Sequence, residues 1–289
     1  MICAERIPTR PAGHNRAAAA RERAHTARRM LASCRLCAWA CAANRLAGER
    51  GFCGAGAEAR CFSAQVEVGD ELELIPTFAV ALSACDLRCR FCITRASSWN
   101  ALAGAPFDAR AVAAGARQAL RQGARTVMVL GGEPTVHLPA ALEFVAELPA
   151  ATRLVWKTNA HASALARDLL EGMFDIWVAD FKFGNDACAE RLAQAPDYLR
   201  SVRENLCWAS RHSDLIVRHL LLPGHVDCCW KPIAAWLATE LPGVKVSLRS
   251  EFWPVRRQRR FPELRRTLST TEADEAVRVA GDWGLNLVE

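Results

Sequence analysis

The 289-residue sequence predicts an α/β fold built on a parallel sheet. Six short runs have the continuous apolar character of strands that are covered on both faces, and helical patterns separate them. Strands that alternate with helices favour parallel pairing through crossover helices. The predicted strands are 76–83, 125–130, 153–158, 175–180, 214–222 and 244–249.

Two of the predicted helices carry clear end signals. Asp108 is the expected N-cap of helix 109–122, and Gly123 follows its end. Ser269 and Glu272 form a capping-box pattern at the start of helix 270–283. The other predicted helices are 138–147, 162–171, 197–212 and 228–240. Periodicity alone allows either an open doubly wound sheet or a barrel.

Composition divides the chain into three parts. Residues 1–30 hold seven arginines against Glu5 and Glu22, so they carry +5 of the net charge of +6. We expect a flexible basic lead-in with some helix from Arg16 to Met30, although nucleic-acid binding or organelle targeting would also suit this charge. Residues 31–75 form a cysteine-rich extension, and residues 76–289 hold the strands and helices.

Composition also bounds the compartment. The chain is 51% hydrophobic and 24% charged, and it has no apolar run long enough to span a membrane. Its first thirty residues lack the hydrophobic centre of a signal peptide. Thirteen cysteines in such a chain favour metal ligation in a reducing cytoplasm over a disulfide framework.

Three cysteines stand close together directly after the first predicted strand. Cys85, Cys89 and Cys92 have the spacing C-x3-C-x2-C, with charged and aromatic residues between them. Inert core thiols are the alternative, but such a loop suits a metal centre better. Thiolates are the ligands of iron–sulfur clusters, and a cubane takes four. Three thiolates from one loop therefore leave one iron open to a ligand from outside the protein.

The second predicted strand ends in Gly131-Gly132-Glu133. A double glycine there allows the backbone to approach a ligand closely, and a neighbouring carboxylate suits an ammonium group. Ligands of parallel α/β folds collect at the carboxyl ends of the strands. This motif and the cysteine triplet are therefore expected to face one site.

Together the two motifs resemble those of radical S-adenosylmethionine (SAM) enzymes, and more narrowly those of pyruvate formate-lyase activating enzymes and their uncharacterised relatives. The family pattern C-x3-C-x-aromatic-C is met by Cys85, Cys89, Phe91 and Cys92, and its G-G-E by residues 131–133. The resemblance covers residues 76–255, with weaker similarity over residues 31–61. It implies a partial (β/α)6 barrel of the radical SAM type with an N-terminal cysteine-rich extension. It also implies a [4Fe-4S] cluster and SAM, which is cleaved to methionine and a 5′-deoxyadenosyl radical that abstracts hydrogen from a substrate.

The resemblance further implies roles for individual residues. Glu133 would accept a hydrogen bond from the SAM amine, Gly131 and Gly132 would leave room for it, and Phe91 would lie near the adenine. The D-x-K and R-x-x-x-x-P-G strands of the activating enzymes face SAM, and here they correspond to Asp180, Lys182 and Arg218. A plain Asp180–Lys182 ion pair is the alternative. Asn159, at the end of the third strand, joins the set, unless it only caps the next helix.

A second metal site is predicted before the barrel. Cys34, Cys37, Cys41 and Cys53 have the spacing C-x2-C-x3-C-x11-C. The segment is too small to fold alone, and a metal would supply the missing stability. Four thiolates suit zinc or a second iron–sulfur cluster, and composition does not choose between them. Thiols packed against the barrel are the alternative.

Three functions fit these observations. The first is a radical SAM enzyme with a flavodoxin- or ferredoxin-type reductant and a protein substrate such as a glycyl-radical enzyme. The second is a radical SAM enzyme that modifies a small molecule, in which Cys188, Cys207 or the Cys228–Cys229 pair donate hydrogen or bind metal unless they are core thiols. The third is an iron–sulfur electron carrier, which would have no need of Glu133. None of the three requires a membrane or nucleic acid.

Overall fold

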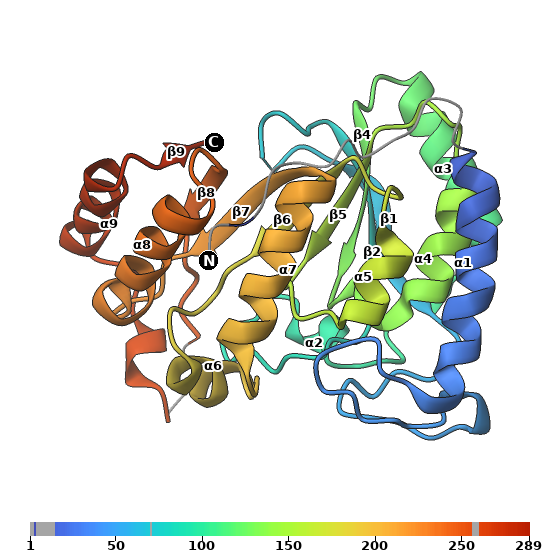
Figure 1. The fold of residues 1–289 in the computed structure, drawn as a ribbon, viewed down its shortest axis with the longest axis horizontal. Helices are drawn as coiled ribbons and strands as arrows, with labels where there is room; N and C mark the ends of the chain where they lie inside the picture. Colours follow the sequence, from blue (N-terminus) through green and yellow to red (C-terminus); the bar gives the residue numbers. More distant parts are fainter. Residues whose placement is uncertain (1–2, 4–14, 70, 256–259) are drawn as a thin grey trace.

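The computed structural model describes residues 3, 15–69, 71–255 and 260–289, and it confirms the predicted α/β class (Figure 1). In this part of the chain one sheet has the strand order β3-β1-β2-β4-β5-β6-β7-β8-β9. Every neighbouring pair from β2 to β9 is parallel, whereas β1 and β3 are antiparallel at one edge. The order is linear, with β3 at one edge and β9 at the other, so the sheet does not close on itself, which is consistent with the expected partial barrel.

The six predicted strands all exist. They are β2 (Thr77–Leu82), β4 (Thr126–Gly131), β5 (Leu154–Thr158), β6 (Ile176–Asp180), β7 (Asp214–Leu220) and β8 (Lys245–Arg249). Three further strands were not predicted: β1 (Arg60–Glu67), β3 (Ala105–Pro106) and β9 (Asn286–Leu287). β1 lies near the sheet edge and is half-exposed, so it lacks an apolar run, while β3 and β9 have only two residues each.

The helices follow the predictions closely, with two additions. They are α1 (Arg16–Met30), α2 (Arg95–Ser98), α3 (Ala109–Arg121), α4 (Leu138–Ala146), α5 (Ala164–Leu170), α6 (Asp186–Ala193), α7 (Tyr198–His212), α8 (Lys231–Glu240) and α9 (Thr270–Asp282). Asp108 caps α3, and the Ser269–Glu272 capping box starts α9. The short helices α2 and α6 were not predicted. Within the described ranges, no helix is long and apolar enough to cross a bilayer.

Helix α1 corrects the expectation of a flexible lead-in as far as residues 16–30 are concerned. Ala20, Ala24 and Ala27 are buried on one face, and α1 packs along α4 (Figure 1). The Arg16 guanidinium is 3% exposed and donates to the Thr152 carbonyl at 2.6 Å. An alanine-rich helix face resembles a low-complexity tail in composition, which is why the packing was missed. Residues 1–2 and 4–14 lie outside the described residues.

The inner face of the barrel has an apolar layer below a charged one. Leu74, from the β1–β2 connection, closes the apolar layer, whose other buried members are Met128, Val155, Ile176, Val178 and Ile216. Side chains two residues apart on a strand point to the same face. Lys157, Asp180 and Arg218 each follow one of these residues by two positions, so they form the layer above it, at the carboxyl ends of the strands.

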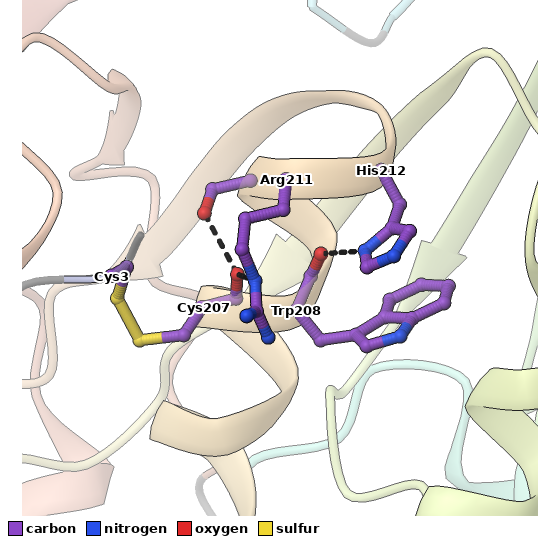
Figure 2. The surroundings of a disulfide bond; sticks show 6 residues. Cys3, Cys207, Trp208, Arg211 and His212 are labelled. Carbon is purple, nitrogen blue, oxygen red and sulfur yellow. Dashed lines mark hydrogen bonds between the residues drawn. A yellow bond between two sulfur atoms is a disulfide. The ribbon is translucent and has the colours of Figure 1, made fainter. Parts of the chain in front are cut away.

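A disulfide joins Cys3 to Cys207 on α7, with 5.1 Å between the Cα atoms (Figure 2). Beside it the Arg211 Nε donates to the Cys207 carbonyl at 3.2 Å. The His212 ring donates to the Trp208 carbonyl at 2.7 Å and stacks on the Trp208 indole. The sequence favoured metal ligation over disulfides, so this bond was not expected. It takes Cys207 out of the thiols that can donate hydrogen or bind a metal.

Candidate SAM and iron–sulfur site

Cys85, Cys89 and Cys92 lie on the loop that leaves β2, at the carboxyl end of the parallel strands. The backbone N–H groups of Arg88 and Arg90 donate to the Ala193 and Leu192 carbonyls at 2.8 Å each, which ties the loop to the end of α6. The Arg88 guanidinium donates to the carbonyls of Cys85 and Phe52. The loop is therefore held in shape from both sides.

The surroundings of the three sulfurs fit an iron–sulfur cluster. Cys85 and Cys89 are buried, and Cys92 is half-buried. The Leu87 N–H points at the Cys85 Sγ from 3.4 Å, and N–H donors to sulfur help to set the potential of clusters. Burial raises the pKa of the Cys89 thiol to about 12, and the Lys182 charge only partly opposes this. Such a thiol ionises when a metal binds it.

The Glu133 carboxylate is 1% exposed and joins the ends of β4 and β5. Its Oε1 accepts hydrogen bonds from the Thr135 N–H at 3.0 Å, the Thr135 hydroxyl at 2.6 Å and the Thr158 hydroxyl at 2.8 Å. Its Oε2 accepts from the Asn159 N–H at 2.7 Å. Burial and the nearby Asp86 charge raise the pKa of Glu133 to about 7. Because a carboxylate oxygen can accept two hydrogen bonds, Oε2 can accept a second one, and its bond to the SAM amine stays a prediction.

Gly131 and Gly132 are required by the close approach of the chain at the end of β2, and the room they would leave for SAM stays a prediction. A Cβ at Gly131 would collide with the Leu82 carbonyl, and one at Gly132 would collide with the Ala84 carbonyl. Gly131 also has φ +145°, which side chains rarely allow. The N–H groups of Gly132 and Glu133 donate to those same two carbonyls at 2.8 and 2.9 Å. The double glycine thereby places the motif directly beside the cysteine loop.

A buried polar network beside Cys85 was missed by the sequence analysis. Asp86 is 0% exposed and accepts from the Asn159 amide at 2.7 Å and from the His161 ring at 3.0 Å. Burial opposes the charge on His161, but Asp86 raises the pKa of its ring above the usual value. Asn159, predicted to contact the cofactor, also accepts from the His161 N–H at 2.9 Å. The spacing Asn159-x-His161 after a strand was the only sequence pattern that could have indicated this network. It does not predict one unless Asp86 is known to lie beside it.

Asp180, Lys182 and Arg218 come together as predicted, on the inner face of β6 and β7. Lys182 donates to Asp180. Burial alone would raise the pKa of Asp180, but the charges of Lys182 and Arg218 lower it more, so the pKa lies below its usual value. Burial alone would lower the pKa of Lys182, but Asp180 and Cys89 raise it more, so the pKa lies above its usual value. Asp180 and Lys182 therefore form the ion pair that was the alternative interpretation, and they also lie near Cys89 of the cysteine loop.

Glu71 supplies the anion that Arg218 needs, and sequence patterns did not reveal it. The Glu71 carboxylate is 0% exposed and lies 3.7 Å from Arg218 Nε, 3.7 Å from Lys157 Nζ and 3.3 Å from Arg249 Nη2. With Asp180 and Lys182 included, this layer holds four cations and two carboxylates, so positive charge is in excess at the floor of the site. Such a floor suits an anionic group of a bound molecule.

Phe91 is buried, and its ring meets the Phe183 ring edge-on, with the centroids 6.0 Å apart. Phe183 in turn packs on Tyr198, whose hydroxyl accepts from the Lys182 N–H at 2.7 Å. Phe91 therefore connects the cysteine loop to the segment that carries Lys182. Its contact with an adenine stays a prediction.

The four N-terminal cysteines converge on one small cavity. Cys34, Cys37, Cys41 and Cys53 line it together with Arg45. The Arg45 guanidinium lies 3.6 Å from the Cys34 Sγ and donates to the Val136 carbonyl at 2.7 Å. Trp39 and Phe52 stack at 3.9 Å, and Trp39 Nε1 donates to the Asp86 carbonyl at 2.8 Å. The extension is therefore packed directly against the cysteine loop of the barrel.

His137, which follows the Gly131–Glu133 motif, gives the fold a pH dependence. It is 2% exposed, and burial together with the Arg45 charge lowers its pKa from 6.5 to about 3. A folded pKa below the unfolded one means stability that is present above pH 6.5 and is lost as the pH falls toward the folded value.

We expect His137→Phe to relieve this loss. The difference in free energy of unfolding, variant minus wild type, should increase by about 2 kcal/mol when the pH is lowered from neutral to about pH 5. Urea unfolding of both proteins at several pH values measures this. A difference between the two proteins that does not change with pH would contradict a neutral, buried His137.

Comparison with known proteins agrees with this geometry. The profile of the radical SAM superfamily matches residues 81–237. An uncharacterized protein of Methanocaldococcus jannaschii is 27% identical over 268 residues, which cover 91% of this chain and 78% of that protein. Two crystal structures of SuiB from Streptococcus suis share the fold with a TM-score of 0.52. The one bound to S-adenosylmethionine is 15% identical and the one bound to the precursor peptide SuiA is 14% identical, each over 71% of this chain.

The superfamily match covers more than half of the chain, so the chain belongs to the radical SAM superfamily. Members of this superfamily are enzymes, and membership implies a [4Fe-4S] cluster and SAM. The chain spans about half the length of the SuiB structures, 47% and 46%, and at this identity they support the fold alone. The narrower resemblance to the activating enzymes stays a prediction.

Proposed function

We propose that this protein cleaves SAM reductively, with Cys85, Cys89 and Cys92 as the ligands of the [4Fe-4S] cluster. The observation that carries the proposal is one buried loop that supplies three cysteine ligands beside a charged, inward-facing layer. When bound, the cluster supplies the electron that breaks the sulfonium carbon–sulfur bond and leaves methionine and a 5′-deoxyadenosyl radical. The radical then takes a hydrogen atom from the substrate.

The chain's own residues hold and orient SAM in this proposal. Lys182 and Arg218 are cationic and face the barrel interior, so they suit the methionine carboxylate. Asp180 is ionised and suits a hydrogen-bond donor of SAM such as the amine or a ribose hydroxyl. Glu133 fixes the Asn159 backbone beside Asp86 and the cysteine loop, and its Oε2 can accept a further hydrogen bond from the SAM amine. Positioning of this kind is the main contribution that a protein makes to cofactor chemistry.

The assay is anaerobic reconstitution with iron and sulfide, followed by dithionite and SAM. The proposal predicts that 5′-deoxyadenosine and methionine are released. An iron–sulfur electron carrier would bind iron and accept an electron but would release neither product.

A peptide or protein is the substrate class we favour. Beside Cys92 the surface is hollowed between Ile93, Arg95 and Trp99, and the Ile93 side chain is 81% exposed. The Arg95 guanidinium stacks on Trp99 at 4.3 Å, so the hollow has an apolar wall with a cationic rim. A structure of SuiB, which has the same fold, holds a precursor peptide. If the substrate is a glycyl-radical enzyme, the polypeptide encoded next to this gene should show a glycyl radical in its EPR spectrum after incubation with this protein, reductant and SAM.

The N-terminal extension is proposed to hold a second iron–sulfur cluster. Cys34, Cys37, Cys41 and Cys53 line one cavity. In the described part of the chain, their sulfurs do not all lie within 4.8 Å of one another, so they are spaced too widely for a single ion. Wider spacing suits a cluster, in which each thiolate binds a different iron.

We expect about eight irons per reconstituted chain and about four in Cys37→Ser. Metal analysis of the two proteins measures this, and Cys61→Ser serves as a control because Cys61 lies outside this cavity. Loss of zinc from Cys37→Ser with unchanged iron would contradict a cluster.

A further inference from the structure

A third group of cysteines lies away from both sites described so far. Cys188, His225, Cys228 and Cys229 bring three sulfurs and one ring nitrogen within 4.8 Å of one another. The His225 Nδ1 lies 3.7 Å from the Cys188 Sγ, 3.3 Å from the Cys228 Sγ and 3.6 Å from the Cys229 Sγ. The Cys228 Sγ lies 3.9 Å from each of the other two sulfurs. We propose that these four residues bind a zinc ion.

The spacing matches the edges of a zinc tetrahedron. With Zn–S of about 2.3 Å and Zn–N of about 2.0–2.1 Å, tetrahedral geometry gives S···S edges of about 3.8 Å and N···S edges of about 3.6 Å. Two of the three S···S separations are 3.9 Å, the third is within 4.8 Å, and the N···S separations are 3.3–3.7 Å. Three thiolates and one imidazole are also a usual ligand set of structural zinc.

Alternative explanations of the cluster account for less. Sulfurs 3.9 Å apart are not disulfide-bonded, since a disulfide needs about 2.05 Å. Weak hydrogen bonds between thiols would explain the two S···S contacts of 3.9 Å. They do not explain why all three sulfurs surround one imidazole nitrogen, which has one lone pair when neutral and none when protonated. A cation between the four atoms gives every one of them a partner.

The local backbone is built to converge on this point. Residues Val226–Trp230 form a π-helical turn just before α8, and such turns are frequent at functional sites. The turn places Cys228 and Cys229, which are adjacent in sequence, on the same side as His225. Cys188 comes from α6, whose N-cap Asn185 donates to the Cys228 carbonyl at 2.7 Å and accepts from the Cys188 N–H at 2.7 Å. A Cβ at Gly184 would collide with the Cys229 carbonyl, so glycine permits the contact.

Two charged side chains lie beside the ring of His225. Arg191 forms an ion pair with Glu263 at 2.6 Å, and its guanidinium lies 3.3 Å from the His225 Nε2. The Glu263 carboxylate lies 3.9 Å from the same nitrogen. Ligation through Nδ1 puts the proton on Nε2, and a guanidinium cannot accept a hydrogen bond, so metal binding requires Glu263 to replace Arg191 as the partner of Nε2.

The proposed ion would connect two loops at the mouth of the barrel. Cys188 lies on α6, which follows β6, and the other three ligands follow β7. The end of α6 receives the Arg88 and Arg90 N–H groups of the cysteine loop. A zinc at this position therefore fixes α6, and α6 in turn supports the loop that carries Cys89.

The test is the metal content of the full chain, purified without oxygen and without added zinc. We expect one zinc per chain to be lost in Cys228→Ser and in Cys188→Ser, with the iron content of both unchanged. Cys61→Ser is the matched control and keeps its zinc, because Cys61 lies outside the group. Zinc-edge X-ray absorption of the wild type should show three sulfurs at about 2.3 Å and one nitrogen at about 2.0 Å.

Two results would overturn the zinc site. One is zinc content equal to the wild type in both cysteine variants, and the other is loss of iron in place of zinc. If both variants fail to fold, X-ray absorption of the wild type still decides, since an absent zinc edge or a shell without the histidine nitrogen excludes the assignment. Because none of these readouts needs SAM cleavage, failure of the proposed function would leave the zinc result intact.

Discussion

Cys89→Ala is expected to abolish release of 5′-deoxyadenosine from SAM. Cys89 is the most central of the three predicted ligands, since it is buried between Cys85 and Cys92 and lies close enough to Lys182 for their charges to interact. Alanine there leaves two thiolates, which is too few to hold a cubane with one open iron. Product measured by chromatography after dithionite reduction should fall to the background of the protein-free reaction, and reconstituted iron should fall by about four per chain.

Cys61→Ala is the control for this result. Cys61 is half-buried on β1, where its Sγ contacts the Ser63 carbonyl at 2.9 Å, and no proposed metal includes it. The control should cleave SAM at the rate of the wild type. Retention of cleavage in Cys89→Ala would show that the loop is not the catalytic centre.

The second large effect is expected at Asp86, through stability. Its carboxylate is 0% exposed and accepts from Asn159 and His161, and the Trp39 indole donates to its carbonyl. Asp86→Ala would remove the carboxylate partner of the buried His161 ring and the oxygen acceptor of the buried Asn159 amide. Removal of one member of a buried ion pair costs about 3–5 kcal/mol. We therefore expect the free energy of unfolding in urea to fall by that amount.

Asp86→Asn is the conservative comparison. The asparagine can still accept from Asn159 and can donate to a neutral His161, so the loss should be about 1–2 kcal/mol. The order alanine, asparagine, wild type in rising stability is the expected outcome. An Asp86→Ala protein within about 0.5 kcal/mol of the wild type would mean that the network does not stabilise the loop.

The sequence predicted the barrel well because parallel strands carry their own signal. β2, β4, β5 and β6 are mostly buried on both faces, and each contains an apolar run of at least three residues. β7 and β8 are buried mainly in their middle residues. β1 lacks this signal because much of it is exposed, and α6 lacks it because it has only eight residues. The packing of helix α1 was not predicted, because its buried alanines contribute contact area but little hydrophobicity to the sequence pattern.

The site was predicted only as far as its residues are close in sequence. The cysteine triplet is a local motif, so its place in the fold followed from one strand. Glu71 and Arg218 are far apart in the chain, as are Asp86 and His161, and the fold alone brings each pair together. The glycines of Gly131–Glu133 were identified, but their backbone contacts with Leu82 and Ala84 were not, because those residues are far away in sequence. Cys188 lies 37 residues from His225, so no spacing rule joins them.

Everything proposed for catalysis depends on a cluster that has one iron free to bind SAM. The most direct test is EPR of the wild-type protein, reconstituted and reduced with dithionite, before and after SAM is added. If SAM binds the open iron, the g-values of the reduced cluster must change when SAM is added, and the spectrum of Cys89→Ala should not change on addition of SAM. A spectrum that is identical with and without SAM, in protein that carries its full iron content, would contradict the account.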